Sequence, residues 1–277
     1  MKISKLSILG VALLFLWCVP VAAHEMFLKP KKYLVDPGAV IQIELVNGTF
    51  DQSENVITRD RMVDVTVHGG GATEHPFPSQ WRDRMLAAVL SHQVKGEGTY
   101  VVGVSTRPRT FEQTVEQFTD YLKHEGIADT LKDFKALAKK PSMVMERYSK
   151  HVKTLIQVGK QRTDDYQKVL GYPVEIILDQ NPYDVVPGEP LSFKVVRKGA
   201  PVANQLVYAS FSGYHHHGED GGHERAITMR TDEEGRAQFT PDRAGIWYTT
   251  LIYMEKLTDD PNADYESNWT TLTFEIE

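Results

Sequence analysis

The sequence predicts a mainly-β protein of two β-sandwich domains joined by a helical insert. Short runs that alternate apolar and polar residues occupy both ends of the 277-residue chain, and turn residues separate these runs. Between the two ends, the apolar period changes to that of a helix. We place a signal peptide at residues 1–23, the N-terminal sandwich at 24–110, the helical insert at 111–171 and the C-terminal sandwich at 172–277.

The first 23 residues have the composition of an export signal. Two lysines precede an apolar run over residues 6–17, and Val21 and Ala23 provide the small residues of a cleavage site. The run is shorter than the roughly 20 residues that span a bilayer, and no later segment reaches that length. We therefore expect an exported, periplasmic protein without a transmembrane segment, whose mature chain begins at His24. A cut at another position is the alternative.

Three strands are predicted in the N-terminal sandwich. A turn at residues 36–38 precedes the first alternating run, a Gly-rich loop at 69–71 follows the second, and a Gly-Glu-Gly break at 96–98 precedes the third. The apolar positions of the first two runs are Ile41, Ile43 and Leu45, and Val63, Val65 and Val67; the third run covers residues 99–105.

Three helices are predicted in the insert. The first begins at Thr110 and Gln113, which have the spacing of a capping box, and the second ends at Pro141. Apolar residues at helical spacing mark each of the three. They are Phe111, Val115, Phe118 and Leu122; Leu131, Phe134 and Leu137; and Met145, Tyr148, Val152, Leu155 and Ile156.

The strand pattern returns after residue 172. A Pro-Gly turn at residues 187–188 precedes an alternating run, as the Pro-Gly turn at 37–38 does in the first sandwich. This likeness suggests that the two sandwiches share an architecture. A Glu-Glu-Gly turn at 233–235 separates two further strands. The other apolar runs are Leu191, Phe193 and Val195; Val207, Ala209 and Phe211; and Leu272, Phe274 and Ile276.

The charge and the cysteine content exclude several kinds of partner and metal ligand. The formal net charge is −6, and cleavage of the signal peptide, which contains Lys2 and Lys5, changes it to −8. A negative surface argues against nucleic acid or anionic lipid as a partner. The single cysteine, Cys18, lies in the signal peptide, so the mature chain has neither disulfides nor thiolate metal ligands.

Histidines form the candidate metal site. A histidine at a free N-terminus offers its α-amine and an imidazole nitrogen together, and nickel and copper favour such donors. His24 would have this position after cleavage. Residues 213–224 contain four more histidines among carboxylates and glycines; in an extended segment His215 and His217 point to one side, with His223 across the loop. The simpler alternatives are that His24 only starts a strand and that the loop is solvated with weak, opportunistic metal affinity.

Eight stretches, in order along the mature chain, resemble the DUF4198 family of exported bacterial proteins. They are AHEMFL at 23–28, FTDYLKHEG at 118–126, ERYSK at 146–150, LIQVG at 155–159, LGYPVEI at 170–176, GAPV at 199–202, AGIWY at 244–248 and ESNWTTLTF at 266–274. Members are often labelled NikM-like, as periplasmic components of nickel or cobalt uptake. The resemblance implies that the N-terminal histidine of the family maps onto His24.

The second β region also resembles the transthyretin-like folds of carboxypeptidase regulatory domains, through KGAPV at 198–202 and TDEEGR at 231–236. We therefore expect both sandwiches to be immunoglobulin- or transthyretin-like.

The resulting prediction is a periplasmic protein that binds a divalent transition metal and acts with a membrane transporter. The resemblance implies nickel or cobalt, and donor chemistry permits copper. An exported module that binds protein or carbohydrate without a physiological metal is the alternative. The mature chain has no G-x-S-x-G elbow, H-E-x-x-H or P-loop, so we expect no enzyme. A mono-copper oxidase with an N-terminal histidine chelate is the third alternative.

Overall fold

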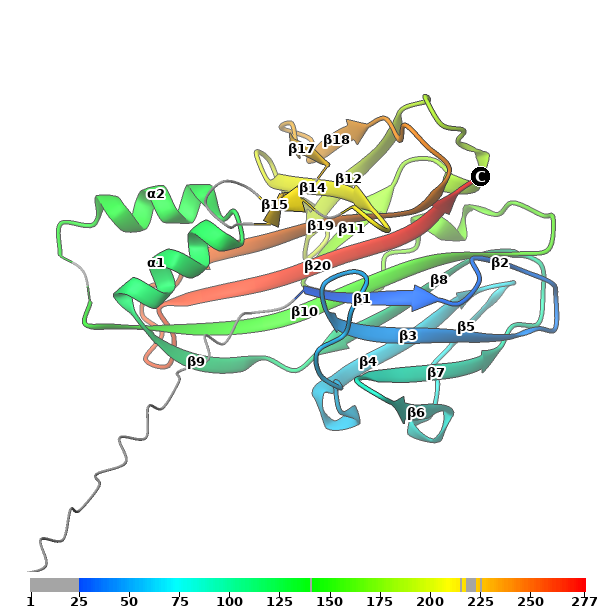
Figure 1. Cartoon of the computed structure of the whole chain (residues 1–277), viewed down its shortest axis with the longest axis horizontal. Helices are drawn as coiled ribbons and strands as arrows, with labels where there is room; N and C mark the ends of the chain where they lie inside the picture. The colour runs from blue at the N-terminus through cyan, green and yellow to red at the C-terminus, as the bar shows by residue number, and fades with distance from the viewer. Residues whose placement is uncertain (1–24, 140, 215, 218–222, 225) are drawn as a thin grey trace, which may run out of the picture.

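A central sheet of ten strands runs through the whole molecule (Figure 1). In this computed structural model the described residues are 25–139, 141–214, 216–217, 223–224 and 226–277. The order across the sheet is β17 (Ile227–Arg230), β14 (Leu206–Phe211), β19 (Gly245–Lys256), β20 (Tyr265–Ile276), β10 (Met143–Val158), β8 (Gly98–Thr106), β4 (Met62–Gly69) and β5 (Ala72–Glu74). Strands β2 (Leu34–Val35) and β9 (Arg109–Thr114) also pair with β10.

Two four-stranded sheets complete the sandwich packing. One has the order β1 (Glu25–Pro30), β3 (Val40–Gly48), β7 (Ala87–Gln93) and β6 (Trp81–Arg84). The other contains β11 (Val174–Leu178), β12 (Leu191–Arg197), β13 (Ala200–Pro201) and β18 (Arg236–Phe239). The remaining elements are the pair β15 (His216–His217) and β16 (His223–Glu224), helices α1 (Val115–His124) and α2 (Ala128–Ala136), and 3₁₀ turns at Arg59–Arg61, Pro78–Gln80, Asp164–Gln167 and Pro182–Asp184.

The two main hydrophobic cores lie on opposite faces of the central sheet. The first four-stranded sheet packs on one face, where Val152 and Ile156 of β10 meet Ile43 of β3. The second packs on the other face, where Leu155 of β10 meets Phe193 of β12. The predicted mainly-β, β-sandwich fold is therefore confirmed. Strands from all three predicted segments of the chain contribute to the shared sheet.

The prediction of a third helix was wrong, because residues 143–158 form strand β10. Sheets cover both faces of this strand, and all of its residues from Ser149 onward are buried. A strand buried on both faces has no apolar–polar alternation in its sequence. The spacing of Met145, Tyr148 and Val152 therefore resembled a helix only by coincidence.

The first helix begins four residues later than predicted. The T-x-x-Q spacing occurs twice in succession, and the functional capping box joins Thr114 to Gln117. The earlier copy lies in β9, where Gln113 pairs with Val144 of β10. The predicted second helix is confirmed as α2.

Both helices cover one end of the central sheet, on the face that also carries β1 (Figure 1). Their buried residues Phe118, Leu122 and Phe134 pack on Val144 and Tyr265. The helices and β1 therefore approach each other from opposite ends of the same face, and this arrangement positions the candidate site.

Candidate functional site

The structure describes two of the four predicted metal-binding histidines. His217 lies opposite His223 where β15 pairs with β16, and His216 lies opposite Glu224. His24 and His215 lie outside the described residues. Among the residues that are described, no three His, Cys, Asp or Glu side chains are grouped closely enough to hold a metal ion. The four-histidine site thus stays a prediction.

Ser212 and Gly213, which we call the stem of the His-rich segment, are hydrogen-bonded to the loop after β3. The Ser212 hydroxyl donates to Asp51 Oδ1 at 3.1 Å, and the Gly213 amide donates to Asp51 Oδ2 at 3.2 Å. Asp51 follows Phe50, whose ring stacks on Tyr248 with 4.5 Å between centroids. The same Phe50 ring meets Phe27 of β1 edge-on at 5.1 Å. One aromatic cluster therefore joins the stem to β1.

Strand β1 begins at the middle of the central sheet. Thr250 Oγ1 donates to the Glu25 carboxylate at 2.9 Å. Further along, Thr271 Oγ1 donates to the Met26 carbonyl at 2.8 Å and Thr273 Oγ1 donates to the Leu28 carbonyl at 2.7 Å. These bonds hold β1 against the face of β19 and β20.

Helix α1 runs along β20 toward the start of β1. Its Phe118 ring lies 4.9 Å from Tyr265, and its Tyr121 ring stacks on Trp269 at 6.2 Å, four residues further along the strand. Glu125 follows one turn after Tyr121 on the same helical face. Glu125 is only 6% exposed.

We call the buried region between the end of α1 and the start of β1 the central seam. It contains side chains from β1, β3, the end of α1, β10, β19 and β20. These are Glu25, Asn47, Glu125, Lys150, Thr250 and Trp269.

Lys150 is the buried cation of the central seam. Its Nζ donates to Asn47 Oδ1 at 2.7 Å and lies 5.5 Å from the centroid of the Trp269 ring. Burial lowers the pKa of Lys150 to about 7, although the charges of Glu125 and Glu25 act in the opposite direction. The lysine therefore changes charge near neutral pH, which is unusual for this side chain.

A buried carboxylate lies beneath α1 on the same face. The Glu146 carboxylate accepts hydrogen bonds from Tyr121 at 3.1 Å, from Gln113 at 3.2 Å and from Ser267. Burial raises the pKa of Glu146 to about 7, and the three hydrogen bonds oppose that rise. This network fastens α1 and β9 to the centre of the sheet.

The opposite face of β10 holds a neutral histidine. The His151 ring lies 2.9 Å from the Ser105 hydroxyl and 3.0 Å from Asn268 Oδ1. Burial lowers the pKa of His151 to about 4, so the ring is neutral at physiological pH. The ring is 2% exposed and thus out of reach of a substrate, so the Ser–His–Asn arrangement is structural.

Sequence reasoning did not single out the seam residues. A signal was nevertheless present, because Glu25, Glu125, Lys150 and Trp269 all fall within the stretches that carry the family resemblance. What the sequence lacked was any indication that stretches more than a hundred residues apart meet.

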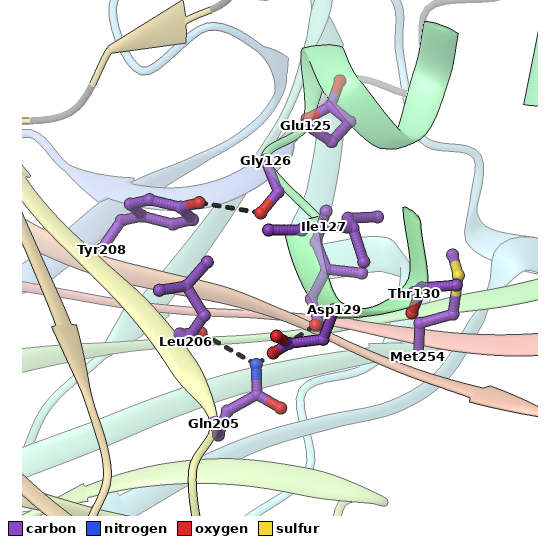
Figure 2. Close-up of a pocket in the computed structure, with 11 residues that line it drawn as sticks. Glu125, Gly126, Ile127, Asp129, Thr130, Gln205, Leu206, Tyr208 and Met254 are labelled. Carbon is purple, nitrogen blue, oxygen red and sulfur yellow. Dashed lines mark hydrogen bonds between the residues drawn. The ribbon is translucent and has the colours of Figure 1, made fainter. Parts of the chain in front are cut away.

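A small pocket lies beside the central seam, where the α1–α2 turn faces β14 and β19 (Figure 2). Tyr208 donates to the Gly126 carbonyl at 2.9 Å, which connects the turn to β14. Gln205 Nε2 donates to the Leu206 carbonyl at 2.8 Å on the other side of the pocket. Glu125 lines this pocket as well as the central seam.

Neither helix in the described part of the chain has the length and apolarity needed to cross a membrane.

The structure defines a mainly-β protein built by β-sandwich packing. The chain belongs to the family described as "Domain of unknown function (DUF4198)", whose sequence model matches residues 21–255. The resemblance seen in the sequence is therefore confirmed at the level of the family. No curated protein matches the chain.

Solved structures give only weak likenesses. The chain is similar to the D0-D1 domain of Intimin at 12% identity and a TM-score of 0.21, covering 89% of this chain and 96% of that one. It is also similar to trypsin-activated alpha-2-macroglobulin from Escherichia coli at 8% identity and a TM-score of 0.21, covering 93% of this chain and 16% of that one. The fold class therefore follows from the strand pairing of the chain itself.

Proposed function

We propose that the processed protein is a periplasmic transition-metal binding protein that delivers its ion to a membrane transporter. The metal is cargo, and it is held by the amine and imidazole of His24 with His215, His217 and His223. Nickel or cobalt is favoured by the NikM-like resemblance, and copper is permitted by the nitrogen donors.

One observation carries this proposal: the stem of the His-rich segment and the start of the mature chain reach the same face of the central sheet. Phe50 contacts both Phe27 of β1 and Tyr248 of β19, and the adjacent Asp51 accepts two hydrogen bonds from the stem. His24 precedes Glu25 directly in the chain, and His215 follows the stem by two residues. His24 and the histidines of residues 215–223, which lie far apart in the sequence, are thus attached to segments that the fold brings together.

The backbone pairing of β15 with β16 also favours a chelate. Directly opposite residues in an antiparallel pair have Cβ atoms about 4.5–5.5 Å apart, a separation that suits two imidazoles on one ion. His217 and His223 hold such positions.

The test is calorimetric titration with Ni²⁺ and Cu²⁺ on protein whose N-terminus is verified as His24. A variant with one alanine added before His24 loses the six-membered chelate that the α-amine and the imidazole Nδ1 of His24 form with the metal, and we expect its affinity to fall at least tenfold. Replacing His215, His217 and His223 by alanine should also weaken binding, whereas the control His75→Ala, at an exposed histidine of the other sandwich, should not. Equal affinity in all four proteins would refute the proposal.

The alternative of an interaction module is favoured by a separate observation. Several large apolar side chains are exposed on the N-terminal sandwich, among them Met85 at 92% and Phe77 at 72%. If the verified protein binds neither metal more tightly than about 10 μM, this second function gains support, and Met85→Ser with Phe77→Ser would be the variants to compare in partner binding.

A further inference from the structure

A buried arginine without a carboxylate partner lies over strand β10. Arg61, in the 3₁₀ turn that precedes β4, is only 6% exposed. Its guanidinium lies over the ring of Tyr148, with 5.5 Å between the guanidinium carbon and the ring centroid. The neighbouring Arg59 pairs with Asp83, whereas Arg61 has no carboxylate at ion-pair distance among the described residues, and its Nη1 has no hydrogen-bond partner there. Buried charged donors are normally paired, so this guanidinium indicates a missing acceptor.

The side chains around this guanidinium carry mostly positive charge. Arg109 lies directly opposite Tyr148 where β9 pairs with β10 (Figure 1), so these two side chains share one face of the sheet. The Arg107 amide donates to the Arg61 carbonyl at 2.7 Å, and the Arg107 Nε donates to the Asp60 carbonyl at 3.0 Å. The Asp60 carboxylate, whose charge acts on Arg61, is exposed. Three guanidiniums therefore gather around one exposed carboxylate, in a chain whose formal net charge is −6.

The geometry of this cluster suits an anion that has at least two oxygens. A guanidinium presents its N–H donors in a planar fork that matches carboxylate and phosphate, and an aromatic ring on which it stacks holds the plane of the fork. Tyr148 supports Arg61 in this way, and the Phe111 ring holds the tyrosine ring edge-on at 5.5 Å. Arg109 is exposed, so its side chain can approach a ligand from the solvent side.

We propose that Arg61 and Arg109 bind an oxyanion, either a carboxylate or a phosphate, beside the ring of Tyr148. The ligand gives Nη1 of Arg61 its missing acceptor and neutralises the excess of positive charge around Asp60. Hydrogen bonds from two guanidiniums to one anion are charge-assisted, and such bonds are stronger than those between neutral groups. The site uses none of the candidate histidines, so it goes beyond the proposed function and does not depend on it.

The test is calorimetric titration of the processed protein, without added metal and at low ionic strength, with inorganic phosphate and separately with succinate. We expect at least one of these anions to bind at one site with a Kd below about 1 mM, and the tighter of the two identifies the class of ligand. Arg61→Gln and Arg109→Gln should each weaken that binding at least tenfold. Arg84→Gln, which removes an exposed arginine at the end of β6, is the matched control and should bind like the parent.

Two results would overturn the oxyanion site. One is that neither anion binds the parent with a Kd below about 1 mM. The other is an equal loss of affinity in Arg84→Gln and Arg109→Gln, because binding would then follow the total charge of the protein. Should Arg61→Gln fail to fold, Arg61→Lys keeps the positive charge and removes the planar fork. Under the proposal Arg61→Lys and Arg109→Gln both bind more weakly than the parent, and parental affinity in both contradicts it.

Discussion

Two buried lysines on strand β10, three residues apart, lie on opposite faces of the sheet and have different surroundings. Lys153 pairs with Glu175 at 3.0 Å, and that carboxylate also accepts hydrogen bonds from the Leu170, Gly171 and Tyr172 amides. Lys150 donates to the uncharged Asn47 and lies over Trp269, with two carboxylates acting on it. Lys153 thus belongs to a buried ion pair at hydrogen-bond distance, whereas Lys150 combines a bond to a neutral amide with a contact to an aromatic ring.

The largest effect should come from breaking the complete pair. Glu175→Ala leaves Lys153 buried without its partner and removes the acceptor of three backbone amides. Loss of one partner of a buried pair costs about 3–5 kcal/mol. Urea unfolding should show a loss of that size, while Lys150→Met, which replaces a lysine bound to a neutral amide, should cost about 1–2 kcal/mol or less. Equal losses in the two variants would contradict the distinction drawn between the two faces.

The next largest effect should be on the way the stability of the fold depends on pH. Burial raises the pKa of Glu146 to about 7, so the folded protein binds more protons than the unfolded chain between about pH 4.5 and 7, and stability falls as pH rises through this window. Burial lowers the pKa of Lys150 to about 7, so the unfolded chain binds more protons between about pH 7 and 10.5, and stability rises with pH there.

Free energies of unfolding measured at pH 5, 7 and 9 test both the predicted fall and the predicted rise of stability with pH. The Glu146→Gln variant should lose the decline between pH 5 and 7 relative to the parent, and Lys150→Met should lose the gain between pH 7 and 9. If both variants follow the parental profile within error, the two groups do not titrate as their burial implies.

The smallest effect on stability should come from the stem of the His-rich segment. Asp51→Ala removes two exposed hydrogen bonds to Ser212 and Gly213 and the 3.8 Å ion pair with Lys29, so the free energy of unfolding should change by about 1 kcal/mol or less. Metal affinity should nevertheless fall several-fold under the proposed function, because the stem is no longer held near β1. Asp36→Ala, in an exposed turn of the same sandwich, serves as the control and should leave calorimetric affinity unchanged.

Local sequence patterns predicted most of the strands and helices that have one buried face and one exposed face. The alternation of Ile41, Ile43 and Leu45 gave strand β3, because one face of this strand is buried and the other is exposed in its first half. Strand β10 did not follow this rule, because both of its faces are covered. The capping box was recognised by its chemistry but assigned to the wrong copy, since only pairing with β10 decides that Arg109–Thr114 is a strand.

The sequence alone determined most of the strand runs, the presence of two helices in the insert, the family and the candidate histidines, because these depend on local spacing, turn chemistry and composition. It also supports the prediction of an export signal ahead of His24. Only the tertiary structure decided that one sheet serves both cores, and that Glu25, Glu125, Lys150 and Trp269 lie together. The physical reason is that this meeting depends on long-range strand pairing and on packing of α1 along β20, and neither has a signature in any single segment of the chain.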